Sequence, residues 1–325
     1  MDFSDEKKIK NAGALINEVR QEIGRRVVGQ TTLVDGLLTG IIAGGHVLVE
    51  GVPGLAKTLA VKTLADVISA MFKRIQFTPD LLPADLTGTM IYRQQTGEFV
   101  PRKGPIFSNV ILADEINRAP AKVQSALLEA MSEGQVTIGE QTYKLPEPFF
   151  VMATQNPIEQ EGTYRLPEAQ LDRFLVKVKV DYPSPAEELM VLERMVDNPH
   201  ISLRRVLDRE KVITLRQAAE AVKAEEGIRR YIVSLVAAGR VKDRKKLPVA
   251  RYIEYGASPR ATLAMYRAAR VQALFDGRAF VLPEDVKAVA PMVLRHRIVL
   301  SYEAEAEQMD ADDVISGLLA AVTVP

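Results

Sequence analysis

The 325-residue sequence contains no cysteine. Disulfide bonds, thiolate metal sites and cysteine nucleophiles are therefore excluded, and the composition is typical of a protein from a reducing compartment. Histidine is also scarce, and His46, His200 and His296 are far apart in the sequence. Because no cysteine accompanies these histidines, we do not expect a histidine-based metal site or nucleophilic site.

Long apolar runs and an excess of charge are missing as well. No apolar run reaches the roughly 18 residues of a membrane span, and the acidic residues 1–6 do not have the form of a signal peptide. Lys plus Arg and Asp plus Glu both number 42, which gives no bulk attraction for nucleic acid or anionic lipid. The basic stretch 240–251 is interpreted as a solvated loop, because no basic stripe extends it. We expect a cytoplasmic protein with no membrane span, and nucleic acid is not an expected partner.

The composition that is present indicates a globular protein, with 47% hydrophobic and 26% charged residues, and the length suggests two domains. Short apolar runs typical of buried strands occur at 46–50, 74–77, 110–113, 149–154 and 175–180. Helices are predicted at 9–26, 31–43, 57–70 and 121–132. Strands that alternate with helices predict a three-layer α/β domain around a parallel sheet.

The segment 182–185 is the predicted domain boundary. Ser184 has the position of a helix N-cap, and Glu187 that of its capping-box partner. Beyond this segment the strand signals largely stop, and helices are predicted to begin near Thr214, Ser258 and Pro283. We therefore expect an α/β core at 1–182 and a small helical bundle at 183–325.

Residues 79–109 do not fit this alternation. They are rich in Pro, Gly and Thr and hold no clear helix. We predict a long loop and hairpin with its turn near 95–97. A loop of this length in a compact domain usually has a function.

The most informative segment follows the first strand-like run and opens a predicted helix, with the sequence Gly51-Val52-Pro53-Gly54-Leu55-Ala56-Lys57-Thr58. A P-loop requires this context. Backbone N–H groups of such a turn can surround phosphates, Lys57 would reach the phosphate oxygens, and the Thr58 hydroxyl would ligate Mg²⁺. Ala56 stands where the usual pattern has glycine, and we expect its φ to be negative. An ordinary glycine-rich turn with an exposed lysine is the alternative interpretation.

Polar residues end two further strand-like runs. Asp114 and Glu115 follow 110–113, and Asn156 follows 149–154. Asp114 would hold Mg²⁺, and Glu115 would orient and deprotonate the attacking water, which is the division of labour that phosphoryl transfer needs. Asn156 could meet the γ-phosphate or that water, since parallel strands deliver their carboxyl ends to one edge of the sheet. Solvated acids and a turn asparagine before Pro157 are the alternatives.

Two arginines follow in the segments 166–174 and 256–260. Arg173 lies in the first of these, and Arg260 falls in the first turn of a predicted helix of the second domain. An arginine from each place could neutralise the charge of a transition state. A surface salt bridge is the alternative for either arginine alone.

Taken in order, these segments resemble the MoxR-type family of AAA+ ATPases over nearly the whole chain. The segment 51–58, alanine included, is similar to the family's own form of the Walker A motif. Further long matches are 77–83, 104–107, 113–118, 153–157 and 166–174. The resemblance implies a three-layer αβα P-loop NTPase core with a parallel sheet, followed by a small all-α lid domain.

The resemblance also implies roles for single residues. Lys57 and Thr58 correspond to Walker A, and Asp114 and Glu115 to Walker B, with Mg²⁺ bound by Thr58 and Asp114. Asn156 corresponds to sensor 1, Arg173 to the arginine finger and Arg260 to sensor 2, and Arg165 is a second candidate for the finger. The residues implied to bind ATP are Val28, Gly29 and Gln30 beside the adenine, together with Gly51, Val52, Pro53, Gly54, Leu55, Ala56, Lys57, Thr58 and Leu59.

A finger that acts on a neighbouring subunit implies a homo-oligomeric ring, commonly a hexamer. The family is associated with chaperone-like maturation of protein clients, often beside proteins that carry von Willebrand factor A domains. The first hypothesis is therefore an ATP-hydrolysing remodelling motor whose loop at 79–109 contacts the client. The alternatives are a nucleotide-switched binding module with little turnover, and a chelatase-type or DNA-directed AAA+ motor.

Overall fold

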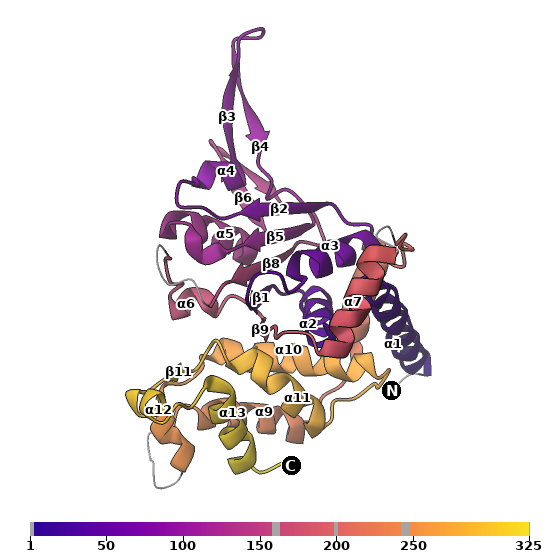
Figure 1. Ribbon diagram of the computed structural model, residues 1–325, viewed down its shortest axis with the longest axis vertical. Coiled ribbons are helices and arrows are strands. Elements are labelled where there is room, and N and C mark those ends of the chain that lie inside the picture. The colour runs from indigo at the N-terminus through magenta and orange to yellow at the C-terminus, as the bar shows by residue number, and fades with distance from the viewer. Residues whose placement is uncertain (1–2, 158–162, 198–200, 242–246, 325) are drawn as a thin grey trace.

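The computed structural model describes residues 3–157, 163–197, 201–241 and 247–324. Figure 1 shows an α/β unit in the middle of the molecule, a hairpin that projects far from it at one end, and a layer of helices at the other end. His200 and residues 242–246 of the basic stretch lie outside the described residues.

Five parallel strands form the central sheet. Their order is β2 (Phe72–Gln76), β5 (Val110–Asp114), β8 (Phe150–Gln155), β1 (Val47–Glu50) and β9 (Val176–Lys179). All five overlap the runs predicted from the sequence, so the predicted parallel sheet is confirmed. Because the strands are parallel, the loops that follow β1, β5 and β8 meet at one edge of the sheet.

Successive side chains of the central strands enter two different apolar cores, because neighbouring residues of a strand point to opposite faces. Val47 and Val49 of β1 belong to the first core, and Leu48 to the second. In β5, Leu112 belongs to the first core and Ile111 to the second. Burial on both faces accounts for the continuous apolar runs in the sequence.

Helices cover both faces of the sheet. The first core lies against α1 (Phe3–Gly24), α2 (Thr31–Ile42) and α3 (Lys57–Val67), and the second lies against α4 (Pro83–Thr87) and α5 (Ala121–Glu133). The three-layer αβα arrangement is therefore confirmed. α1 begins earlier than its apolar spacing predicted, and α3 ends before the predicted residue 70.

The stretch 79–109 contains the predicted hairpin, formed by β3 (Gly88–Arg93) and β4 (Glu98–Lys103) with its turn at 94–97. Gly88 has a φ of +100°, and a Cβ there would lie 2.2 Å from the carbonyl oxygen of Arg102, so only glycine lets the strands start this close together. The one-turn helix α4 was not predicted. A second hairpin, β6 (Gln135–Ile138) and β7 (Gln141–Lys144), was also missed.

The chain after β9 is mostly helical, as expected. Its elements are α7 (Pro185–Asp197), α8 (Arg209–Ala221), α9 (Glu226–Ala238), α10 (Pro259–Phe275), α11 (Pro283–Leu294), α12 (Tyr302–Ala306) and α13 (Ala311–Ala321), with the short strands β10 (Ile253–Tyr255) and β11 (Val299–Leu300). The remaining short helices of the described chain are α6 (Glu168–Leu171), η1 (Ile116–Arg118) and η2 (Pro248–Tyr252).

The predicted helix starts of this region are confirmed in three of four cases. The backbone N–H of Ser184 donates to the carboxylate of Glu187 over 2.8 Å, as in a capping box. α10 and α11 begin at the predicted prolines. The predicted start at Thr214 is wrong, because Asp208 caps α8 by accepting from the N–H of Lys211, and Thr214 lies inside the helix.

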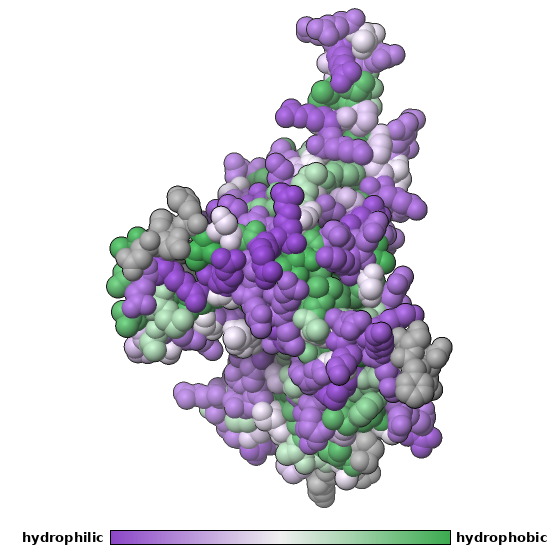
Figure 2. Space-filling model, turned by 90° about the vertical axis from the view of Figure 1, so that its right-hand side faces the viewer, coloured by the Kyte–Doolittle hydropathy of each residue, from purple (hydrophilic) through white to green (hydrophobic). Residues whose placement is uncertain are grey.

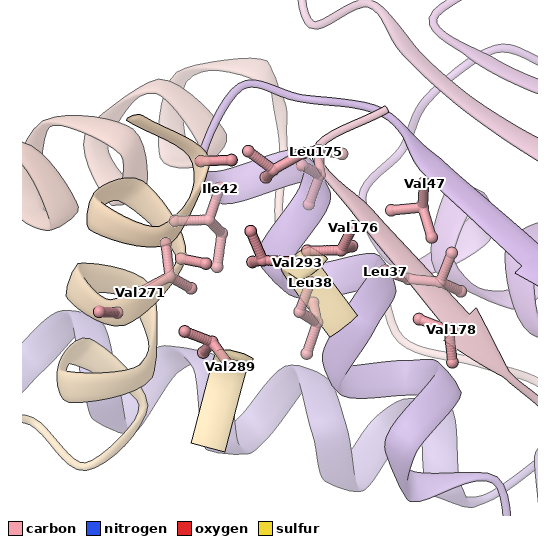
Figure 3. Packing of buried hydrophobic residues seen from close by; sticks show 14 of the residues in the cluster. Leu37, Leu38, Ile42, Val47, Leu175, Val176, Val178, Val271, Val289 and Val293 are labelled. Atoms are coloured by element: carbon pink, nitrogen blue, oxygen red, sulfur yellow. The ribbon is translucent and has the colours of Figure 1, made fainter. Parts of the chain in front are cut away.

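The lid packs tightly onto the first face of the sheet. Figure 3 shows Val271, Val289 and Val293 of the lid beside Ile42 of α2 and Val176 of β9. One continuous apolar core thus joins the helical region to the α/β unit, and the boundary at 182/183 stays a prediction. Within the described residues, no helix is both long and apolar enough to cross a membrane.

Candidate active site

The turn between β1 and α3 has the backbone of an anion-binding loop. Gly54 and Ala56 have φ values of +88° and +55°, both in the left-handed region. Alternation of left-handed residues with others turns successive N–H groups toward one concavity, and α3 begins directly behind Ala56. The expected negative φ of Ala56 is therefore wrong: the left-handed conformation aims the first amides of α3 into the loop, although it strains a residue with a Cβ.

Lys57 lies over this loop. Its Nζ donates to the carbonyl oxygens of Gly51 and Val52, the second at 3.2 Å. Half-burial lowers the pKa of Lys57, whereas the nearby carboxylates of Asp114 and Glu115 act in the opposite direction. The lysine and both acids thus share one electrostatic environment.

A cavity of 330 Å³ opens beside the loop. Its walls come from three parts of the chain, and its lining residues are Val28, Gln30, Pro53, Gly54, Leu55, Ala56, Tyr182, Pro183, Glu188 and Val191. Gly29 has a φ of +69° and approaches α7 closely, since a Cβ there would lie 2.5 Å from the Glu187 carboxylate. The segment 28–30 therefore lies next to the loop, and α7 closes the far side of the cavity.

Asp114 and Glu115 stand at the end of β5, joined by a buried threonine. The backbone N–H of Glu115 donates to the hydroxyl of Thr154 over 2.8 Å, and that hydroxyl donates to Asp114 Oδ1 over 2.6 Å. Arg74 donates to Asp114 Oδ2 over 2.6 Å, and Gln76 donates to Glu115 Oε2 over 2.8 Å. Glu115 has a left-handed backbone with φ +55°. Each carboxylate is thus fixed by a neighbouring strand.

The donor types at this edge fit Mg²⁺. Its preferred ligands are oxygens of carboxylates, hydroxyls and phosphates. Each Asp114 oxygen that already accepts a protein hydrogen bond can accept another, and Thr58 lies in the first turn of α3. In the part of the chain that the structure describes, no group of three or more His, Cys, Asp or Glu could hold a metal alone. Mg²⁺ that arrives with a nucleotide needs only one or two protein ligands.

Asn156 directly follows β8, the strand between β5 and β1, and it is 7% exposed. The sheet order therefore puts this side chain between the acidic strand end and the phosphate loop. Leu59 follows Thr58 in the first turn of α3 and packs against the first core.

Arg173 and Arg260 do not line the cavity at the phosphate loop. Both line a second cavity of 320 Å³, together with Gly44, Gly45 and His46, which directly precede β1. Arg173 precedes β9 and donates to the carbonyl oxygen of Leu128 over 2.9 Å and to Ser132 over 2.7 Å. These arginines therefore lie at the amino ends of the strands.

The phosphate loop is at the opposite edge. β1 spans four residues, which at about 3.3 Å per residue separates the two edges by roughly 13 Å. Within one chain, Arg173 and Arg260 therefore share a cavity that is separate from the one at the phosphate loop. Arg165 is exposed in the loop before α6.

The segments that carry Arg173 and Arg260 are connected through the buried ion pair of Asp172 with Arg297. Asp172 accepts from Arg297 Nε over 2.7 Å at one oxygen and from Ser258 Oγ over 2.7 Å at the other. Ser258 also caps α10, whose first turn carries Arg260. The arginine of the core and that of the lid are therefore held through a single carboxylate.

Several residues of this site were not predicted. Thr154 was visible as the polar residue that ends the apolar run 149–154, which is a usable signal. Arg74 and Gln76 lie on an edge strand and carry no motif. Tyr182 and Glu188 line the cavity only because α7 folds back over the loop, and nothing in their local sequence indicates this.

The fold and this arrangement define a P-loop ATPase of the AAA+ class. Residues 46–176 match the ATPase family associated with various cellular activities (AAA), and residues 246–318 match the AAA lid domain. Chaperone MoxR1 of Mycobacterium tuberculosis is 50% identical over 94% of this chain and 81% of its own. Protein MoxR of Methylorubrum extorquens is 34% identical over 94% of both. The chain belongs to the MoxR family of AAA+ ATPases.

A solved structure agrees with this assignment. The crystal structure of a candidate ATPase from Cytophaga hutchinsonii superposes with a TM-score of 0.92 at 51% identity, covering 99% of this chain and 98% of that one. The similarity therefore includes the lid as well as the core.

Proposed function

We propose that this chain hydrolyses ATP with Mg²⁺ and uses the cycle to remodel protein clients. The observation that carries the proposal is the convergence of Lys57, Asp114 and Glu115 at a left-handed glycine-containing loop. The chaperone name of a 50% identical relative supports protein clients. A cytoplasmic location is part of the proposal, favoured by the lack of cysteine.

Each residue then has one task. The loop amides and Lys57 would hold the phosphates, and Thr58 and Asp114 would hold Mg²⁺, whose charge would offset that of the phosphate oxygens. Glu115 orients and deprotonates the attacking water. Its two hydrogen bonds from Gln76 and Arg118 fix the direction of its carboxylate. Asn156 positions the γ-phosphate or the water.

The arginines complete the site from a neighbouring copy. The phosphate loop lies at the carboxyl ends of the strands and the two arginines lie at the amino ends, so they do not meet within one chain. They meet when copies are arranged head to tail. Such an arrangement closes into a ring, which we take to be a hexamer. Arg173 is the proposed finger and Arg260 the proposed sensor.

The hairpin β3–β4 is the proposed client contact. Tyr92 and Phe99 face each other across its strands, with ring centroids 5.3 Å apart, and are 56% and 67% exposed. Exposed aromatic rings far from both cores are suited to transient apolar contacts with another protein. Proteins with von Willebrand factor A domains are candidate partners.

Phosphate release by three purified proteins tests the activity. Wild type should hydrolyse ATP, whereas Lys57→Ala should lose nucleotide binding and Glu115→Gln should bind ATP with at least a hundredfold slower turnover, because the water lacks its base. Wild-type turnover no faster than that of the two variants would refute the motor. If the wild type binds ATP tightly but releases no phosphate under conditions in which it assembles, the chain is the nucleotide-switched binding module instead.

A further inference from the structure

Helix α7 carries an apolar face that the other described residues leave uncovered. Leu189, Leu192 and Val196 lie on one side of the helix and are 56%, 60% and 68% exposed. In Figure 2 α7 forms a lobe that stands out from the body, with hydrophobic side chains on its outer edge. We call these three residues the α7 surface.

The α7 surface is held in place beside the nucleotide cavity. Arg194 Nη1 donates to the carbonyl oxygens of Gly24 and Arg25 over 2.6 and 3.0 Å, which fixes the helix to the end of α1. Glu188 and Val191 of the same helix line the cavity at the phosphate loop. The α7 surface therefore belongs to the same helix as one wall of the nucleotide cavity.

A second surface of the chain has the matching properties. Arg260, Leu263 and Arg267 lie one turn apart along one side of α10 and line the cavity that holds Arg173. Leu263 is 60% exposed. No carboxylate among the described residues forms an ion pair with Arg260 or Arg267. We call these three residues the α10 surface.

We infer that the α10 surface of one protomer docks on the α7 surface of the next copy. The inference rests on the proposed function, in which Arg173 and Arg260 enter a neighbour's nucleotide cavity. Leu263 lies between Arg260 and Arg267, so it arrives at the rim of that cavity together with them. An unneutralised pair of arginines then meets Glu188 and the phosphates, and the apolar side chains of both helices leave water together.

The absence of cysteine makes a direct test clean, because every reactive thiol is introduced on purpose. Leu192→Cys and Leu263→Cys are combined in one chain, and the assembly is treated with a short bis-maleimide in the presence of ATP. Each chain offers one thiol on each surface, so the reaction should link copies into covalent trimers and larger species. Either single variant can give at most dimers. The matched control replaces Leu192→Cys with Val233→Cys, an exposed valine on α9.

Covalent multimers from the Leu192–Leu263 pair, at least tenfold more abundant than from the Val233–Leu263 pair, support the docking. Equal yields from both pairs, in samples that assemble, overturn it. An internal cross-link within single chains also overturns it, because the two surfaces would then face each other in one protomer.

Introducing a negative charge into the apolar contact gives a second readout. Leu192→Asp and Leu263→Asp should weaken assembly at least tenfold in sedimentation, whereas Val233→Asp should not, and ATP binding per chain should stay unchanged. If both aspartate variants assemble normally, the proposed docking of the two surfaces is refuted, but the proposed ring is not. Wild type that hydrolyses ATP as a monomer would instead refute the proposed ring, and the docking with it.

Discussion

His46 is a side chain whose protonation state follows from burial and its two neighbours. The backbone N–H of Val151 donates to its Nδ1 over 3.1 Å, so the proton must be on Nε2, which donates to the carbonyl oxygen of Met131 over 3.1 Å. Burial lowers the pKa of His46 to about 4. The histidine beside β1 is thus a neutral structural group.

This burial predicts a pH dependence of stability. Between about pH 6.5 and 4 the unfolded chain binds a proton at His46 that the folded chain does not, so the free energy of unfolding should fall as the pH is lowered, by roughly 3 kcal/mol in all. Burial lowers the pKa of His296 in the same direction. Urea unfolding between about pH 6.5 and 5 should show a shallower slope for His46→Gln, because one of two such groups is gone. An unchanged slope would contradict this assignment.

Asp172 and Arg297 form the buried ion pair with the largest predicted effect on stability. The Arg297 side chain is 2% exposed and that of Asp172 is 14% exposed. Asp172→Ala should lower the free energy of unfolding by about 3–5 kcal/mol, because it leaves a buried guanidinium without its counter-charge. Arg230→Ala is the control, since its pair with Glu226 is mostly exposed and should contribute less than about 1 kcal/mol. Guanidinium unfolding measures both, and equal effects would contradict the prediction.

At the scale of elements, the sequence predicted best where one physical signal dominates. The strands are apolar runs because the sheet is buried on both faces, and a proline at the first helical position marks the starts of α10 and α11. The missed elements lack such a signal: α4 is a single turn, and β6 and β7 are only four residues long each. The start predicted near Thr214 was wrong because Asp208 caps α8 six residues earlier.

The hairpin β3–β4 should be separable from the rest of the chain. Gly88 and Lys103 pair at its base, and most side chains beyond them are exposed. Replacing 89–102 by a short glycine-serine turn should change the free energy of unfolding by less than about 1 kcal/mol, because no core residue is removed. Basal phosphate release should stay within twofold of wild type, while client-stimulated release is lost. Loss of ATP binding in this variant would show that the hairpin supports the site itself.

At the scale of the whole molecule, the sequence located the candidate residues but not their relation in space. The residues of the phosphate loop and of the strand ends converge because strand order alone brings them together. The distance of Arg173 and Arg260 from that loop depends on how the lid packs below the sheet, through contacts such as those of Asp172 with Ser258 and Arg297. These contacts join residues that are 86 and 125 positions apart in the chain, and no local pattern indicates them.

The most direct test of the account mixes two variants that should each be inactive. Lys57→Ala chains cannot hold the nucleotide, and Arg173→Ala chains cannot complete their neighbour's site. In mixed rings about a quarter of the seams pair an intact loop with an intact arginine, because half of the chains supply each. Phosphate release should therefore return to about a quarter of the wild-type rate in an equal mixture. If the mixture stays as inactive as its components, although both variants assemble with each other, the two halves of the site do not meet between copies.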